Sequence, residues 1–255
     1  MGNTLNSGKP MDPLPVGESK LAVVTGAARR VGKSIAVHLA QKGYAIGLHY
    51  HQSDEEAVET AREIEAIGAK VILLKADLSC PEEVQNLFRK VETSDFILSL
   101  LINSAATMKQ KNLLEMTIEE WDQIFDLNTR AVWLCSREAA SRMTEGGLIL
   151  NISDIGAQKN WTSYGAYTIS KAAVESITRV MARQLAPQIR VCCIAPGLLM
   201  KADGQSSQGW QNLVDKVPMG RPTRMEELLA SIDFLLENNY ITGETIHLAG
   251  GYQLV

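Results

Sequence analysis

The chain has 255 residues, of which 45% are hydrophobic and 21% are charged, so it is long enough for one large α/β domain but barely for two. Its net charge of -4 gives no basic field for nucleic acid or an anionic membrane surface, and we expect a small-molecule partner. No apolar run reaches the ~18 residues of a membrane span, and the first twenty residues lack a signal peptide, which predicts a cytoplasmic protein. The four cysteines have no metal-ligand spacing and predict buried thiols without a metal site.

Short apolar, β-branched runs alternate with amphipathic segments from residue 20 onward, whereas residues 1–19 are rich in Gly, Pro, Ser and Asn and predict a disordered leader. The pattern predicts strands at 21–25, 44–50, 71–74, 98–102, 148–152, 190–195 and 245–248. It predicts helices at 31–42, 54–67, 82–92, 117–143, 161–185 and 224–236. We therefore expect a single Rossmann-like, doubly wound α/β domain over 20–255, with a seven-stranded, mainly parallel sheet and helices on both faces. Ligands bind such a sheet at the carboxyl ends of its strands.

Tyr167 and Lys171 lie four residues apart in a predicted helix, so their side chains share one helical face. An ammonium beside a phenol favours the phenolate, and the pair therefore predicts a tyrosine with a lowered pKa that transfers protons. A solvated helix face explains most Tyr-x-x-x-Lys pairs, so this interpretation depends on the residues around the pair.

The segment from Thr25 to Gly32 reads T-G-A-A-R-R-V-G and joins the first predicted strand to the first predicted helix. A tight glycine turn at a helix N-terminus offers free backbone N–H groups and the positive end of the helix dipole to a phosphate. An ordinary βα turn also fits a lone pair of glycines, but the position directly after the first strand favours a dinucleotide site.

The end of the second predicted strand reads H-Y-H-Q-S over residues 49–53 and contains no carboxylate. Dinucleotide-binding folds that use the unphosphorylated cofactor place an acidic residue there for the ribose 2′-hydroxyl. Because Arg29 in the adjoining turn can meet a 2′-phosphate, the sequence favours NADPH over NADH. A surface histidine at a strand end is the plainer alternative for His51.

With Thr25-Gly26, Asn103, Asn128 and the Tyr167/Lys171 pair in this order, the chain resembles the short-chain dehydrogenase/reductase family over residues 20–255. The resemblance implies that Tyr167 supplies a proton, that Lys171 holds the ribose hydroxyls and that Asn128 holds a water for the proton relay. It also implies cofactor contacts from three further places: Asp77 at the adenine, the run N-S-A-A from Asn103 through Ala105 to Ala106 below the adenosine, and the turn Pro196-Gly197 beside the nicotinamide.

At two positions the sequence departs from the family pattern, and there it resembles the pteridine reductases in particular. Arg30 replaces the middle glycine of the turn, and Asp154 stands where the usual catalytic serine lies, thirteen residues before Tyr167. We expect the Arg30 guanidinium to point toward the pyrophosphate and the substrate side of the pocket. Ser153 cannot take the role of the serine, because neighbours on a strand face opposite sides.

In the pteridine reductases, the residues that match His51 and Ser53 help to hold the 2′-phosphate. Gln52 replaces the arginine between them, so we expect weaker NADPH binding. Met108 replaces the aromatic residue that sandwiches the pterin, which leaves the choice of substrate open.

These residues predict an NADPH-dependent reductase of a pterin or a similar N-heterocycle, because an ionised Asp154 only accepts hydrogen bonds and suits a substrate with N–H donors. The alternative is an NADPH-dependent carbonyl reductase of the 3-oxoacyl-carrier-protein or general alcohol type, which Met108 and the apolar segment 198–200 favour. A non-catalytic NADP(H)-sensing protein is the third hypothesis.

The predicted helices at 117–143 and 161–185 carry apolar residues on more than one face, including Trp133, Val174, Ile177 and Met181. Such helices need a second partner besides their own sheet. The family resemblance makes that partner the same helices of another subunit, so we expect a homotetramer.

Overall fold

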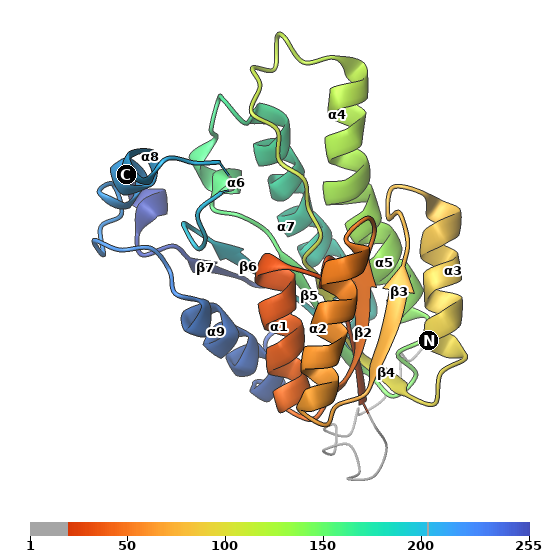
Figure 1. Cartoon of the computed structure of the whole chain (residues 1–255). Helices are drawn as coiled ribbons and strands as arrows, with labels where there is room; N and C mark the ends of the chain where they lie inside the picture. The colour runs from red at the N-terminus through yellow and green to blue at the C-terminus, as the bar shows by residue number, and fades with distance from the viewer. Residues whose placement is uncertain (1–19, 203) are drawn as a thin grey trace, which may run out of the picture.

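A seven-stranded sheet forms the centre of the computed structural model, which describes residues 20–202 and 204–255 (Figure 1). The strands lie in the order β3-β2-β1-β4-β5-β6-β7, and every neighbouring pair is parallel. Their bounds are β1 (Lys20–Val24), β2 (Ala45–Tyr50), β3 (Val71–Lys75), β4 (Ile97–Asn103), β5 (Gly147–Ile152), β6 (Ile189–Pro196) and β7 (Thr245–Leu248). The predicted doubly wound sheet is thereby confirmed, whereas the leader predicted over 1–19 lies outside the described residues.

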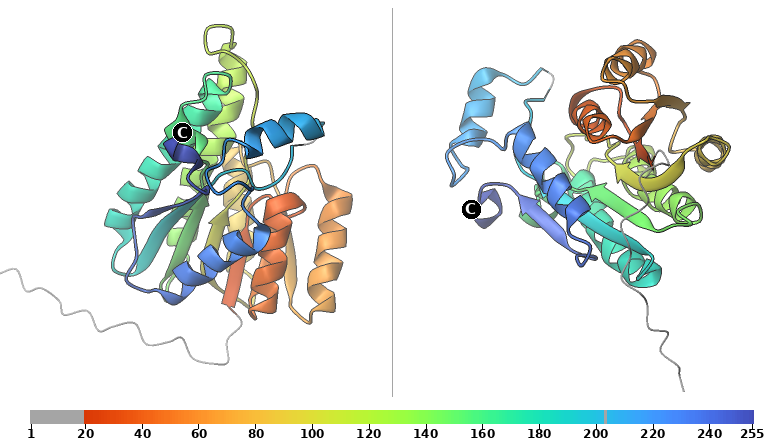
Figure 2. Two further views of the ribbon diagram at one scale, coloured as in Figure 1. Left: turned by 90° about the vertical axis from the view of Figure 1, so that its left-hand side faces the viewer. Right: turned by 90° about the horizontal axis from the view of Figure 1, so that it is seen from below.

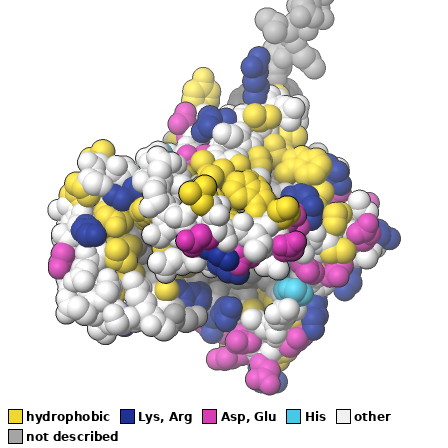
Figure 3. Space-filling model, turned by 90° about the horizontal axis from the view of Figure 1, so that it is seen from above, with side chains coloured by type: hydrophobic (Ala, Val, Ile, Leu, Met, Phe, Trp, Pro, Cys, Tyr) yellow, Lys and Arg dark blue, Asp and Glu magenta, His cyan; other side chains and the backbone are white. Residues whose placement is uncertain are grey.

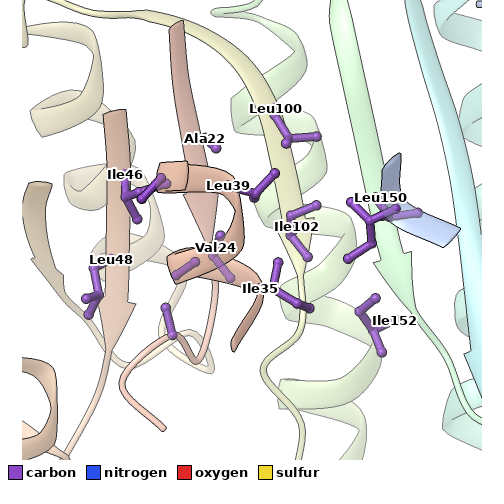
Figure 4. Close-up of a cluster of buried hydrophobic side chains, with 14 of the residues drawn as sticks. Ala22, Val24, Ile35, Leu39, Ile46, Leu48, Leu100, Ile102, Leu150 and Ile152 are labelled. Carbon is purple, nitrogen blue, oxygen red and sulfur yellow. The ribbon is translucent and has the colours of Figure 1, made fainter. Parts of the chain in front are cut away.

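Alternate residues of the central strands enter two hydrophobic cores, one on each face of the sheet. In β1, Val24 faces the first core and Val23 faces the second. Figure 4 shows the first core, where Ile35 and Leu39 of helix α1 pack against strand residues such as Ile102. All of these side chains are fully buried, and each stabilises the fold by roughly 1.5–3 kcal/mol. Burial on both faces explains why the strands appear in the sequence as continuous apolar runs.

Helices cover both faces of the sheet (Figure 2). The layer over the first core consists of α1 (Arg30–Gln41), α2 (Asp54–Ala66) and α9 (Met225–Glu237). The layer over the second core consists of α3 (Pro81–Glu92), α5 (Ala131–Ala140) and α7 (Gly165–Leu185). None of the helices in the described part of the chain is both long enough and apolar enough to cross a membrane.

The helix predicted over 117–143 is not continuous. Its first part, α4 (Ile118–Phe125), begins with a capping box between Thr117 and Glu120. A π-helical turn, η1 (Asp126–Arg130), then connects α4 to α5. Such turns are rare and often occur at functional sites, and this one contains Asn128.

Three short helices lie outside the predicted elements: α6 (Gly156–Lys159), α8 (Ser207–Val214) and the 3-10 turn η2 (Tyr252–Leu254). They have 4, 8 and 3 residues, which is too short for an apolar period to predict a helix. The long helix α7 begins at Gly165 rather than at residue 161, because α6 and a loop occupy the segment before it.

The direction of the chain reverses at β1. From β1 the chain runs outward through β2 to β3, and it then returns to β4 on the other side of β1. The loops that follow β1 and β4 therefore diverge and open a crevice at the carboxyl edge of the sheet, the upper edge in Figure 1.

Candidate active site

Two cavities open at the carboxyl edge of the sheet. The first, of about 840 Å³, is lined by the glycine turn after β1 and by the loops after β2, β3 and β4. The second, of about 920 Å³, is lined by the loops after β5 and β6, by Tyr167 of α7 and by residues of α8. Figure 3 looks onto this edge, where hydrophobic side chains form a band across the face of the molecule.

The glycine turn after β1 has the backbone of a phosphate-binding site. Gly26 has a φ of +67°, and a Cβ at this position would lie 3.0 Å from the Cα of Ala105. A Cβ on Gly32 would collide with the carbonyl oxygen of Gly26. Among the described residues no side chain caps the N-terminus of α1, and Arg29 lines the cavity beside it. Free N–H groups and a guanidinium are therefore available to a phosphate.

Thr25 and Asn103 support this turn from inside the protein. The Thr25 hydroxyl accepts hydrogen bonds from the N–H groups of Ser104 (2.9 Å) and Ala105 (3.0 Å), which fixes the loop after β4 to the turn. The buried Asn103 amide donates to Asn151 across 2.8 Å in the core, so its side chain does not line the first cavity, and its contact with the cofactor stays a prediction. Ser104 and Ala105 line the first cavity instead.

The ends of β2 and β3 carry the side chains expected around the adenosine. His51, Gln52 and Ser53 line the first cavity, and Asp77 faces them from the loop after β3. The His51 ring lies 3.9 Å from the Asp77 carboxylate. Burial raises the pKa of Asp77, but hydrogen bonds from the hydroxyl (2.7 Å) and the N–H (2.9 Å) of Ser79 outweigh it and leave this pKa below its usual value.

Asp154, just beyond β5, accepts a hydrogen bond from the Tyr167 hydroxyl across 3.0 Å, and its other oxygen accepts one from the N–H of Gly156 (2.6 Å). Both Asp154 and Tyr167 line the second cavity. The buried Lys171 ammonium donates to the carbonyl oxygen of Ile152 (2.8 Å) and lies 5.8 Å from the centre of the Tyr167 ring. The structure thus brings three of the predicted catalytic side chains together at one end of β5.

The predicted lowering of the Tyr167 pKa is wrong. Burial raises the pKa of Tyr167 well above its usual value, and the charge and hydrogen bond of Asp154 raise it further. Lys171 does not offset this, because its ammonium is turned toward Ile152 and burial lowers its own pKa. Burial also raises the pKa of Asp154, against the hydrogen bond from Gly156. Tyr167 is therefore a phenol at neutral pH and holds a proton that it can give.

Asn128 lies in η1, and its side chain makes three hydrogen bonds. Its amide oxygen accepts from the N–H of Thr107 (2.8 Å), and its amide nitrogen donates to the carbonyl of Thr107 (2.8 Å) and to the hydroxyl of Ser170 (3.1 Å). These bonds connect η1 to the loop after β4 and to α7. The amide oxygen keeps a second lone pair, so the relay water that the family resemblance implies stays a prediction. The three bonds position the loop and the helix around Tyr167.

Ser153 points away from the second cavity, as expected for the neighbour of Asp154. Its hydroxyl lies 3.1 Å from the carbonyl oxygen of Lys171 and 3.2 Å from the carboxylate of Glu175, within the core. The hydrogen-bonding group presented to a substrate at this position is therefore the carboxylate of Asp154.

Pro196 and Gly197 end β6 and hold the loops of the second cavity together. The Pro196 carbonyl accepts a hydrogen bond from the N–H of Ile155 (3.0 Å). Gly197 lines the cavity, and a Cβ on it would lie 2.9 Å from the Cβ of Ala249. The close approach of the loops after β5, β6 and β7 therefore requires a glycine at this position.

Arg30 connects the two cavities. It has a φ of +53°, a conformation that costs a residue other than glycine about 1–2 kcal/mol. Its side chain lines the first cavity and donates to the carbonyl oxygen of Lys201, in the loop after β6, across 3.1 Å. The guanidinium therefore reaches from the turn after β1 to the loop after β6.

The second cavity has aromatic walls that the sequence did not predict. Its lining includes Trp161, Tyr164, Trp210 and Tyr252, together with Met108. A Cβ on Gly156 would lie 3.0 Å from both the Trp161 ring and the Asp154 carboxylate, so the indole and the carboxylate are neighbours. Only the run W-T-S-Y before Tyr167 hints at such a wall, because the other aromatic residues come from distant segments.

Comparison with known proteins supports the interpretation of the carboxyl edge of the sheet as a candidate active site. A family model described as Enoyl-(Acyl carrier protein) reductase matches residues 26–253. The chain belongs to the short-chain dehydrogenase/reductase family. This reductase is 36% identical over 248 residues to a short-chain type dehydrogenase/reductase of Picea abies, a match that covers 91% of this chain and 92% of that protein.

Two further relatives of this short-chain reductase differ in the substrate that their names give. The 3-oxoacyl-[acyl-carrier-protein] reductase FabG of Staphylococcus aureus is 31% identical over 240 residues, covering 91% of this chain and 98% of that protein. The crystal structure of FolM alternative dihydrofolate reductase 1 from Brucella suis, in complex with NADP, matches with a TM-score of 0.87 and 30% identity over 92% of this chain and 95% of that one. The chain is an oxidoreductase of this family.

Proposed function

We propose that this protein is an NADPH-dependent reductase that transfers hydride to a pterin, a dihydropterin or a related N-heterocycle. The observation that carries the proposal is the carboxylate of Asp154, which lines the second cavity and accepts the hydrogen bond of Tyr167. The proposed setting is the cytoplasm, where a small molecule is the substrate.

The residues of the first cavity fit NADPH. The uncapped N-terminus of α1 and Arg29 suit phosphate groups, and His51 and Ser53 suit the 2′-phosphate, where no carboxylate follows β2 directly. Asp77 faces them from the loop after β3, with its carboxylate 3.9 Å from the His51 ring, at the position proposed for the adenine. When bound, NADPH supplies the hydride, and the side chains of the chain supply orientation and the proton.

Tyr167 is the proposed proton donor. Its phenol is protonated at neutral pH and hydrogen-bonded to Asp154, which fixes the direction of the hydroxyl. The Asp154 oxygens have further lone pairs besides those used by Tyr167 and Gly156. They can accept hydrogen bonds from the 2-amino and N–H edge of a pterin, whereas a ketone oxygen would face a carboxylate and be repelled.

The aromatic wall also suits a flat heterocycle. Met108 leaves the loop after β4 without an aromatic side chain, but the Trp161 ring lies beside Asp154 and faces the same cavity. A ring whose N–H edge binds Asp154 can therefore pack on the indole, an aromatic contact of about 0.5–1.5 kcal/mol beyond the area that it buries. Trp161 is our candidate for the aromatic surface that packs on the heterocycle, since Met108 does not provide one.

Reduction of a 3-oxoacyl thioester or a simple ketone is the second candidate function. Leu198, Leu199 and Met200 give the cavity an apolar side that an acyl chain could cover. The relationship to FabG of Staphylococcus aureus favours the same substrate class. Asp154 opposes it, because the family's serine would donate to the carbonyl and a carboxylate cannot.

A substrate panel with NADPH separates the two candidates. We expect wild type to reduce dihydropterin or dihydrofolate with a kcat/KM well above that for acetoacetyl thioesters. Asp154→Ser should lower kcat/KM for the pterins about tenfold and raise it for ketones, because the serine restores a donor. The isosteric Asp154→Asn is the matched control for charge. Efficient reduction of thioesters or ketones by wild type, with no turnover of any pterin, would replace the first candidate by the second.

A further inference from the structure

His49 holds the glycine turn from the end of β2, where it is buried with only 3% of its surface exposed. Its Nδ1 lies 3.0 Å from the backbone nitrogen of Gly26, and its Nε2 lies 3.1 Å from the carbonyl oxygen of Ala76, just beyond β3. The carbonyl oxygen of His49 also accepts the N–H of Ala27 across 2.8 Å. One residue therefore holds two successive amides of the turn.

The two partners fix the chemical form of the ring. The Gly26 N–H can only donate, so Nδ1 must be an acceptor, and the Ala76 carbonyl can only accept, so Nε2 must carry the proton. Only the neutral Nε2–H tautomer makes both bonds. A buried histidine between Leu48 and Tyr50 of a strand is costly unless it is bonded in this way.

We propose that His49 is a positioning residue of the cofactor site, whose Nδ1 keeps the Gly26 turn in the conformation that receives the dinucleotide phosphates. Gly26 has no room to move toward the loop after β4, where Ala105 closes off that side. Loss of the bond from His49 would free it on the opposite side, next to the N-terminus of α1. The inference rests on the proposed use of NADPH and not on the choice of substrate.

The electrostatic surroundings favour the neutral ring that the proposal requires. The titratable groups whose charges act on His49 are His51, beyond its own strand, and Asp77, beyond β3. Burial is the strongest influence and, with His51, favours the uncharged form. The bond to Ala76 and the charge of Asp77 act in the opposite direction but do not outweigh burial.

Two substitutions separate the two ring nitrogens. In His49→Asn the side-chain oxygen can occupy the place of Nδ1 and accept from Gly26, whereas in His49→Gln the amide reaches only the place of Nε2 and Ala76. Isothermal titration with NADP⁺ at pH 7.5 should give a dissociation constant within about threefold of wild type for His49→Asn and at least tenfold weaker for His49→Gln. In steady-state kinetics His49→Gln should raise KM for NADPH by a similar factor, whereas His49→Asn should keep KM for NADPH near the wild-type value.

His38→Asn is the matched control, since His38 bonds Asp233 across 2.9 Å on the other end of α1. It should lower the melting temperature without changing the affinity for NADP⁺. Equal affinities of His49→Asn and His49→Gln would overturn the proposal and leave His49 a space-filling residue. No binding of NADP⁺ to wild type would instead refute the proposed cofactor.

Nitrogen-15 NMR of histidine-labelled wild type tests the same inference should either variant fail to fold. We expect the resonances of the Nε2–H tautomer for His49 and a shift of its Nδ1 signal on addition of NADP⁺, with no shift for His38. An Nδ1–H tautomer, or a signal that NADP⁺ leaves unchanged, would contradict the positioning role.

Discussion

The charge state of Tyr167 is decided by its neighbours rather than by its spacing from Lys171. Four residues of helix place the two side chains on one face, but the Lys171 ammonium binds the Ile152 carbonyl and the phenol binds Asp154. Replacing the family's serine by a carboxylate removes a neutral partner of the phenol and adds a negative one. The phenolate is therefore disfavoured, which supports the proposed role of Tyr167 as a proton donor.

Removal of the Tyr167 hydroxyl should abolish most of the turnover. Tyr167→Phe deletes the proton donor, so we expect kcat to fall about 10²-fold or more, with the affinity for NADP⁺ and the melting temperature nearly unchanged. Because the pKa of Tyr167 is raised, wild-type kcat should not decline between pH 7 and 9 from loss of this proton. Steady-state kinetics over this range measure both effects. Activity of Tyr167→Phe within threefold of wild type would show that the proton comes from another group.

His49 should make the fold sensitive to mild acid. Burial lowers the pKa of His49 from 6.5 to about 4, so between these values the unfolded chain binds a proton that the folded chain does not. The free energy of unfolding therefore falls as the pH drops from 6.5 to about 4, and between pH 7 and 5 this residue accounts for about 2 kcal/mol. In urea unfolding at fixed protein concentration, the free energy of unfolding of His49→Asn should fall between pH 7 and 5 by about 2 kcal/mol less than that of wild type. Parallel pH profiles of wild type and variant would contradict the prediction.

At the scale of elements, the turn after β1 and the loop after β6 are joined by Arg30. The contact with the Lys201 carbonyl is made by a residue whose φ of +53° suits glycine better. A strained residue that bridges two binding loops indicates that the bridge has a function, since glycine would relieve the strain.

Arg30→Gly should therefore separate substrate binding from stability. We expect KM for the substrate to rise at least fivefold, because the loop after β6 loses its anchor, while the melting temperature changes little. Relief of the strained φ stabilises the folded variant, whereas the added chain entropy of glycine stabilises its unfolded state. The two effects on the free energy of unfolding therefore oppose each other. Arg29→Gly, one residue away and without the positive φ, is the control and should act mainly on the affinity for NADP⁺. If KM for the substrate is unchanged in Arg30→Gly, Arg30 serves the cofactor site alone and does not anchor the loop after β6 for the substrate.

The elements differ in how well the sequence predicts them, for physical reasons. Strands buried on both faces and helices with one apolar face leave a periodic pattern, so the sheet and the layers were predicted correctly. The π-turn at Asn128 was not, because it continues the helical pattern on either side. In α8 a single serine, Ser206, caps the helix by accepting from Gly209, but a helix of 8 residues is too short for its apolar period to stand out in the sequence.

In the candidate site, too, the sequence predicts some residues and misses others. Residues in a motif next to a strand end, such as Arg29, Asp154 and Tyr167, were located because the order of strands fixes where they meet. The wall formed by Trp161 and Tyr252 was not, since it depends on the packing of the chain end against the loop after β5. The sequence also could not predict the pKa of a buried group, because this pKa depends on the direction in which each neighbouring side chain points.

At the scale of the whole molecule, two groups of exposed apolar side chains lie on separate faces. Trp133, Ile169 and Val180 of α5 and α7 are 43%, 40% and 57% exposed. The structure corrects part of the expected set, because Val174 and Met181 are buried within the chain itself. On another face, Phe234 of α9 is 49% exposed and Tyr240 is 99% exposed, beside β7, the last strand of the sheet.

Two self-complementary faces on one subunit generate a tetramer with three twofold axes, so we predict a homotetramer. Light scattering of wild type at micromolar concentration should give about four times the chain mass of 27.9 kDa. Trp133→Glu buries a charge at the first face and Phe234→Glu at the second, so each should leave a dimer held by the other face, and the double variant a monomer. Val58→Glu on α2, where the side chain is 39% exposed, should remain tetrameric as the control. A monomeric wild type would show that both faces remain open to water.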